Sequence, residues 1–181
     1  MKALIQNTVK VFKNRGYTTF KKEILDKNRA FIRAKKPDKD SIILCMNYET
    51  LGVALIRDAI KELDKSKKIK HRVIVGAGKV TRSAKNEMIS NDIEFIPAQL
   101  VMMDILQHEF VPKHEIITEE EELQKILEYY QLAKEELPAI LTNDPVAIII
   151  GARPGDVVRI IRRSRTAGEA VIYRQCIQAE E

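Results

Sequence analysis

The chain has 181 residues, 45% hydrophobic and 31% charged, a balance typical of one ordinary soluble domain or two small ones. Its apolar runs are too short to cross a bilayer, and its lysine-bearing first 25 residues lack the continuous apolar core of a secretory signal. Only two cysteines occur, Cys45 and Cys176, which excludes a disulfide scaffold and a four-cysteine zinc site and favours a reducing compartment.

The net charge of +5 is unevenly distributed along the chain. Residues 1–106 contain 22 Lys and Arg against 12 Asp and Glu, whereas residues 107–181 contain 9 against 14. This asymmetry predicts two units with different partners, and the basic unit would suit a polyanion. Lysines that only keep surface helices soluble explain the same charge, so both interpretations stay open at this point.

Residues 1–106 alternate between helical and strand patterns, which is typical of an α/β layer domain. Helices are predicted at residues 3–14, from Thr18 or Thr19 to Asp26, from Thr50 to about Lys68, and from Ser83 onward. Strands are predicted at residues 30–35, 41–46, 72–75 and 93–96, the first two as a hairpin. Residues 100–106 fit either a strand or a helix on periodicity alone.

Residues 107–181 read as a small α+β unit. Strands are predicted at residues 113–117, 157–163 and 169–178, with turns at residues 154–156 and 164–168. Thr118 and Glu121 form a capping-box pattern that opens a helix running to about Tyr130. Asp144 and Pro145 supply the cap and first residue of a second short helix, which Gly151 ends.

Patterns of known chemistry are incomplete throughout the chain. Gly76-Ala77-Gly78 follows a strand but lacks the remaining residues of a P-loop or a dinucleotide fingerprint. His108 and His114 are six positions apart, with Pro112 between them, rather than the four that place two metal ligands on one helix face. The predicted strands at 41–46 and 72–75 carry no acid, so a magnesium-dependent nuclease site cannot be assembled. We therefore predict no catalytic residue, metal or cofactor.

Two groups of basic residues remain. Lys79, Arg82 and Lys85 open a predicted helix, where cations and free N–H groups suit phosphate oxygens. The second group lies on the last hairpin and comprises Arg159, Arg162, Arg163, Arg165 and Arg174. Some of these arginines could pair with acids of a partner or of residues 119–122, and a solvated face explains them equally well. Aromatic residues are only 6% of the chain, which argues against single-strand binding by base stacking.

Three short segments stand in a characteristic order in the second half: HEFVPKHEIIT at 108–118, LPAILTNDPVAIIIGARPGDVVRIIRRS at 137–164 and TAGEAVIYR at 166–174. By these motifs the second half resembles the assembly domain of the fifth-largest subunit of eukaryotic nuclear RNA polymerases, a family that has an archaeal branch. The first half resembles the family's jaw domain more weakly, through Arg15-Gly16-Tyr17 and Thr81-Arg82-Ser83-Ala84-Lys85.

The resemblance implies an α/β N-terminal jaw domain (1–106), with a strand at residues 100–106, followed by a small α+β C-terminal assembly domain (107–181). It also implies a non-catalytic subunit of a multisubunit DNA-directed RNA polymerase. In the family the assembly domain docks on the largest subunit and adjoins another small shared subunit, while the jaw lies beside downstream duplex DNA. The residues implied to lie nearest the DNA are Lys79, Thr81, Arg82, Ser83 and Lys85. Those implied to hold the assembly domain in its docking shape are Pro112, His114, Asp144, Pro145, Gly151, Gly155, Asp156, Thr166, Gly168, Tyr173 and Arg174.

The chain departs from the family pattern at a few positions. Arg82 stands where proline is usual, Arg165 stands where an acid is common, and the region between residues 28 and 41 is short. Because the archaeal members lack the jaw, the resemblance is to the eukaryotic type. We expect a nuclear location and no membrane association, or the host cytoplasm or virion if a large DNA virus encodes the chain. The alternative function is a stand-alone DNA-binding or transcription-regulating module that shares the assembly fold.

Overall fold

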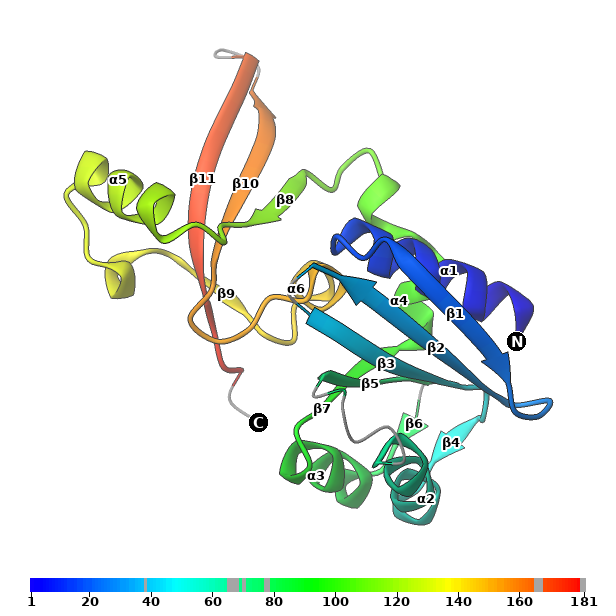
Figure 1. Ribbon diagram of the computed structural model, residues 1–181. Helices are drawn as coiled ribbons and strands as arrows, with labels where there is room; N and C mark the ends of the chain where they lie inside the picture. The colour runs from blue at the N-terminus through cyan, green and yellow to red at the C-terminus, as the bar shows by residue number, and fades with distance from the viewer. Residues whose placement is uncertain (38, 65–68, 70, 77–78, 165–167, 180–181) are drawn as a thin grey trace. The chain divides into compact units, whose positions relative to one another are not determined.

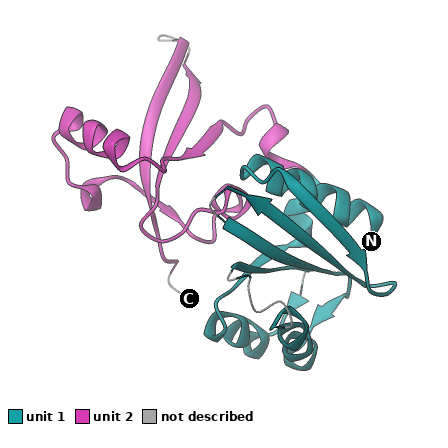
Figure 2. Cartoon of the chain, in the orientation of Figure 1, with its two compact units in different colours: residues 1–103 teal, residues 104–181 magenta. Residues whose placement is uncertain are grey.

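The computed structural model describes the chain apart from residues 38, 65–68, 70, 77–78, 165–167 and 180–181 (Figure 1). The chain divides into two compact units (Figure 2). Unit 1 is Met1–Met103 and unit 2 is Asp104–Glu181.

Unit 1 is built on a five-stranded mixed sheet with the strand order β1-β2-β3-β5-β7. The strands are β1 (Thr19–Ile24), β2 (Arg29–Lys36), β3 (Lys39–Met46), β5 (His71–Gly76) and β7 (Ile93–Pro97). The first three strands form an antiparallel meander, whereas β3, β5 and β7 run parallel. Four strands agree with the prediction, but the helix expected between Thr18 or Thr19 and Asp26 is wrong. That segment is β1, and its pairing with β2 outweighs a local cap signal.

Helices cover both faces of this sheet (Figure 1). They are α1 (Lys2–Asn14) and α4 (Ala98–Met103) on one face, and α2 (Val53–Asp64) and α3 (Arg82–Ser90) on the other. Alternate β3 residues serve the two faces: Ile42, Leu44 and Met46 pack with α2 and α3, while the Cys45 thiol contacts Thr8 of α1 at 3.7 Å. Burial raises the pKa of Cys45 to about 11, so this thiol stays protonated at neutral pH.

Two further predictions in unit 1 need correction. Thr50 does not cap a helix, because Thr50–Leu51 form the short strand β4, which pairs in parallel with β6 (Lys79–Val80). Helix α2 starts only at Val53, and the expected continuation toward Lys68 reaches residues outside the described part of the chain. Residues 100–106, for which the family resemblance favoured a strand, instead continue α4 to Met103 and form the 3-10 turn η1 (Ile105–Gln107).

Unit 2 contains a four-stranded sheet with the order β8-β10-β11-β9. The strands are β8 (Lys113–Ile116), β9 (Ala139–Leu141), β10 (Val157–Ser164) and β11 (Gly168–Ile177). β10 pairs antiparallel with β8 and β11, as its hairpin pattern predicted, and β9 joins β11 in parallel. The sequence analysis did not predict β9, because three residues after Pro138 are too few to show a period.

Two helices and one 3-10 turn complete unit 2. They are α5 (Glu120–Tyr130), α6 (Pro145–Ile150) and η2 (Lys134–Glu136). α6 is capped as predicted. For α5, the capping box at Thr118 is wrong, because Glu119 is the residue before the helix and its side chain makes no cap bond. Ile117 N–H still donates to Val157 O of the sheet at 2.9 Å, which delays the helix start past the expected cap.

Candidate functional site

The five residues expected nearest DNA lie together at the start of α3. Lys79 belongs to β6, Thr81 precedes the helix, and Arg82, Ser83 and Lys85 lie in its first turns. All five are exposed. The Gly-x-Gly loop before them is described only at Gly76, because residues 77 and 78 lie outside the described part.

Packing around Gly76 holds this segment in place. A Cβ atom at Gly76 would overlap Leu51 Cδ1, so the fully buried Leu51 side chain would have to shift to admit any larger residue there. Thr81 N–H donates to Leu51 O at 3.2 Å, which joins the start of α3 to β4. Thr81 Oγ1 accepts from Ala84 N–H at 3.3 Å, so the cap is Thr81 rather than a residue nearer Ser83.

The first turn of α3 has no acidic residue, so nothing there offsets the positive end of the helix dipole. Lys79, Arg82 and Lys85 add three exposed cations around that end. Groups arranged in this way contact phosphate oxygens without reading a base sequence. The start of α3 is therefore chemically suited to a phosphate group.

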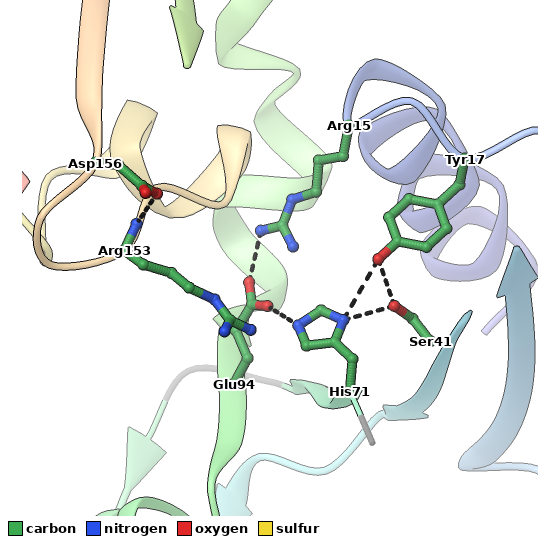
Figure 3. A network of polar contacts seen from close by, with 7 residues as sticks. All are labelled: Arg15, Tyr17, Ser41, His71, Glu94, Arg153 and Asp156. Atoms are coloured by element: carbon green, nitrogen blue, oxygen red, sulfur yellow. Dashed lines mark hydrogen bonds and ion pairs between the residues drawn. The ribbon is translucent and has the colours of Figure 1, made fainter. Parts of the chain in front are cut away.

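A second polar group lies inside unit 1, at the amino-terminal ends of its parallel strands (Figure 3). Ser41 of β3, His71 of β5 and Glu94 of β7 come from neighbouring strands, and Arg15 and Tyr17 come from the segment after α1. His71 Nε2 lies 2.9 Å from Glu94 Oε2, and His71 Nδ1 lies 2.5 Å from Ser41 Oγ. Arg15 Nη2 donates to Glu94 Oε1 at 2.6 Å, and Tyr17 Oη lies 2.5 Å from Ser41 Oγ.

The ionised carboxylate of Glu94 determines where the protons of this network lie. Burial by itself raises the pKa of Glu94, but the charge of Arg15 and hydrogen bonds from His71 and Arg15 outweigh it and lower the pKa to about 2. The carboxylate can accept only, so His71 Nε2 carries a proton. In the neutral tautomer, Nδ1 is then the acceptor for a hydroxyl group.

The order of groups resembles the serine–histidine–acid arrangement of hydrolases. Ser41 is completely buried, however, so its Oγ cannot reach a substrate. The network instead fastens the segment after α1 to three strands. The sequence analysis missed it because its members lie up to 79 positions apart, and only the strand pairing brings them together.

In unit 2, most of the residues expected to hold the docking shape form hydrogen bonds within the unit. Asp144 Oδ1 accepts from Val146 N–H at 2.8 Å and from Ala147 N–H at 3.2 Å, with Pro145 as the first residue of α6. Gly151 ends that helix with a φ of 80°, in the left-handed region that favours glycine. The N-terminal and C-terminal signals of α6 are therefore both used as the sequence predicted.

The turn before β10 is tied to β11. Gly155, at a φ of 92°, donates its N–H to Cys176 O at 2.8 Å, and Asp156 O accepts from Cys176 N–H at 2.7 Å. Asp156 Oδ2 also accepts from Arg153 N–H at 2.7 Å (Figure 3). These bonds give the turn a single geometry relative to the sheet.

The remaining expected residues fall into three places. His114 Nδ1 donates to Pro112 O at 2.7 Å at the start of β8. The ring centroids of Tyr173 and Tyr130 lie 5.9 Å apart. Arg174 Nη1 donates to Ala139 O of β9 at 2.7 Å. Gly168 begins β11, while Thr166 lies outside the described part of the chain.

For the arginines of the last hairpin, pairing with acids and a solvated face both stayed open, and Arg159 forms two ion pairs within unit 2. Its Nη1 donates to Glu122 Oε1 of α5 at 2.6 Å, and its Nη2 donates to Glu115 Oε2 of β8 at 2.8 Å. Hydrogen bonds from Lys113 and Arg159 lower the pKa of Glu115. Arg162 and Arg163 are exposed, whereas Arg165 lies outside the described part.

Among the described residues, no group of three or more His, Cys, Asp or Glu side chains is placed to hold a metal ion. No helix among them is long and apolar enough to span a membrane.

Known proteins similar in sequence to this chain match residues of both units. The family model described as RNA polymerase Rpb5, C-terminal domain, matches residues 103–176. The Methanococcoides burtonii protein named DNA-directed RNA polymerase subunit Rpo5 is 49% identical over 73 residues, which cover 40% of this chain and 92% of the relative. Its namesake from Methanosarcina acetivorans is 53% identical over 79 residues, covering 44% of this chain and 100% of the relative.

A longer match comes from Dictyostelium discoideum. Its protein, named DNA-directed RNA polymerases I, II, and III subunit rpabc1, is 34% identical over 152 residues, which cover 79% of this chain and 76% of the relative. Because unit 2 comprises only residues 104–181, that match extends into unit 1. The chain therefore belongs to the Rpb5/Rpo5 family of RNA polymerase subunits.

Proposed function

We propose that the chain serves as a non-catalytic subunit of a multisubunit DNA-directed RNA polymerase. The observation that carries this proposal is the match to the Dictyostelium subunit, because it spans 79% of this chain and includes residues of both units. Phosphodiester chemistry belongs to other subunits in this account. The contribution of this chain is to assemble with them and to present a surface to DNA.

Unit 2 is the anchor. The Methanosarcina acetivorans relative is matched over its whole length by 79 residues, or 44% of this chain. That relative is therefore about as long as unit 2 alone. The capped helix α6, the fastened turn at Gly155 and the Arg159 pairs give unit 2 one defined surface without a ligand. Such a preorganised surface loses little conformational entropy on binding. It docks on the largest polymerase subunit beside another small shared subunit.

Unit 1 is the jaw beside downstream DNA. Lys79, Arg82 and Lys85 surround the positive end of α3 and contact duplex phosphates without base recognition. Binding of this kind weakens steeply as salt rises. The chain resides wherever its polymerase works: the nucleus for a cellular enzyme, or the host cytoplasm or virion for a viral one.

Truncation separates the two roles. A tagged 104–181 fragment, expressed in the native cell, should co-purify with the largest polymerase subunit, whereas a 1–103 fragment should not. Polymerase carrying only the 104–181 fragment should release downstream duplex at lower salt than polymerase carrying the full chain. Failure of the 104–181 fragment to assemble would contradict the proposed division of roles.

A paired substitution tests the basic segment within the full chain. Arg82→Ala with Lys85→Ala should lower the salt concentration at which duplex is released, and Lys61→Ala should not. Lys61 is a suitable control because its side chain is 77% exposed, on α2 rather than α3. Equal effects of both variants would mean that general charge, rather than the start of α3, retains DNA.

A further inference from the structure

Strand β1 leaves an outer edge of the unit 1 sheet open. It is the outermost strand, and within the described residues of unit 1 it pairs only with β2. Every β1 residue except Phe20 is exposed, whereas β3 is buried from Ser41 to Met46. An exposed strand edge is a ready template for pairing with another extended chain.

Ladder geometry shows which main-chain groups face outward. Leu25 N–H donates to Arg29 O at 3.1 Å, and these residues continue the β1–β2 register. In an antiparallel ladder, alternate residues direct both their N–H and C=O groups to the partner strand. The odd-numbered residues of β1 therefore face β2, and Phe20, Lys22 and Ile24 direct their main-chain groups away from the sheet.

Cations lie on both faces of this edge. Lys21 lies directly opposite Arg33 of β2, a like-charge arrangement that destabilises a sheet. Neither side chain forms an ion pair with another described residue, and both are exposed. Lys22 follows Lys21 and so points to the other face. Edge lysines also discourage unwanted strand pairing, but Arg33 is on an inner strand, where that protection is not needed.

We propose that the outer edge of β1 binds an extended acidic segment of another protein, which joins the sheet as a sixth strand. Two consecutive acidic residues of the segment lie beside Lys21 and Lys22, one on each face, because neighbouring side chains of a strand point to opposite faces. An apolar residue beyond them packs on Ile24, whose side chain is 65% exposed. Glu23 repels an acidic segment that slips by one residue, and so defines the register.

This edge lies on different elements from the start of α3, and the inference does not depend on the proposed polymerase function. The probe is a peptide of sequence acetyl-Val-Thr-Glu-Glu-Thr-Val-amide, which places a valine beside Ile24 when its glutamates lie beside Lys21 and Lys22, and which reads the same in both directions and so fits a parallel or an antiparallel strand. Added to the ¹⁵N-labelled full chain, it should slow the amide exchange of Phe20, Lys22 and Ile24 by about tenfold at saturation. The amides of Lys21 and Glu23 already bond to β2 and should not change.

Two substitutions separate main-chain pairing from charge. Lys22→Gln removes one cation and should weaken binding by about threefold. Ile24→Pro removes one outward N–H without changing the charge, at a position where an edge strand tolerates proline, and should weaken binding by a similar factor. If Ile24→Pro disturbs β1, a probe N-methylated at alternate residues tests the same contact on the intact chain. Lys13→Gln, exposed in the last turn of α1, is the matched control and should leave binding unchanged.

Four results would overturn the proposal. One is uniform protection along β1 without alternation, or none at all. Another is equal binding of the peptide with Lys-Lys in place of Glu-Glu. The third is unchanged binding of the N-methylated probe, which would mean that charge alone attracts it. Displacement of the peptide by a duplex of about 20 base pairs at equal charge concentration would assign this edge to nucleic acid instead.

Discussion

The buried network around Glu94 gives a quantitative prediction for unit 1. Glu94→Gln keeps the size of the side chain but removes the charge that Arg15 and His71 contact. The pKa of Glu94 falls from an ordinary 4.5 to about 2 in the folded chain. At about 1.4 kcal/mol for each pKa unit, the carboxylate contributes about 3 kcal/mol to the stability of unit 1.

The pH dependence has a definite sign. Because the folded pKa is depressed, the contribution is fully present above about pH 4.5 and is lost as the pH falls toward 2. We expect urea unfolding of the full chain, followed through the amide resonances of Ile43 and Val75, to show this loss in the original chain. The Gln variant should be about 3 kcal/mol less stable at pH 7 and should lack this part of the acid dependence.

A matched control is Glu87→Gln, which breaks the 3.1 Å pair with the exposed Arg57. A surface pair of this kind contributes less than about 1 kcal/mol. If Glu94→Gln cost no more than Glu87→Gln at pH 7, the argument that the network fastens unit 1 would be refuted.

Three further substitutions test local packing and caps. Gly76→Ala should destabilise unit 1 by about 1–3 kcal/mol, because the new methyl group overlaps Leu51. Urea unfolding monitored at unit 1 resonances would measure this loss, and an unchanged stability would contradict the close approach of Gly76 to Leu51. Asp144→Ala should cost unit 2 about 1 kcal/mol and speed amide exchange at Val146 and Ala147, whereas unchanged exchange would show that the cap contributes little. Arg159→Met should cost unit 2 about 1 kcal/mol at low salt and less in 1 M salt, because its partners are partly exposed; a loss that does not depend on salt would point to packing instead.

Local signals explain the elements that the sequence predicted well. The cap at Asp144, Pro145 at the first helical position and Gly151 at the end lie within eight residues, and each acts through its immediate neighbours. The strand at β3 was also clear, because a run of buried apolar residues is typical of a strand covered on both faces.

Elements that depend on distant pairing were predicted poorly. Thr18 and Thr19 resemble a helix cap, yet the residues after them form β1, because β2 supplies a partner that no local pattern reveals. Residues 98–103 form α4, where Val101 is buried and neighbouring methionines are exposed, a pattern too short to separate from a strand.

The candidate sites divide in the same way. Exposed cations near the start of α3 could be placed from sequence, since a helix start was predicted at Ser83, two residues after the observed cap at Thr81. The Glu94 network could not, because a serine, a histidine and a glutamate on three separate strands share no spacing. Only the register of β3, β5 and β7 makes them neighbours.

Affinity purification of the full chain, tagged at its own locus, tests the central claim most directly. We predict that the two largest polymerase subunits co-purify in near-equal amount with the tagged chain and that the complex sediments with RNA-synthesising activity. Recovery of the chain alone, or only with unrelated regulators, would contradict the polymerase assignment and favour a stand-alone DNA-binding module.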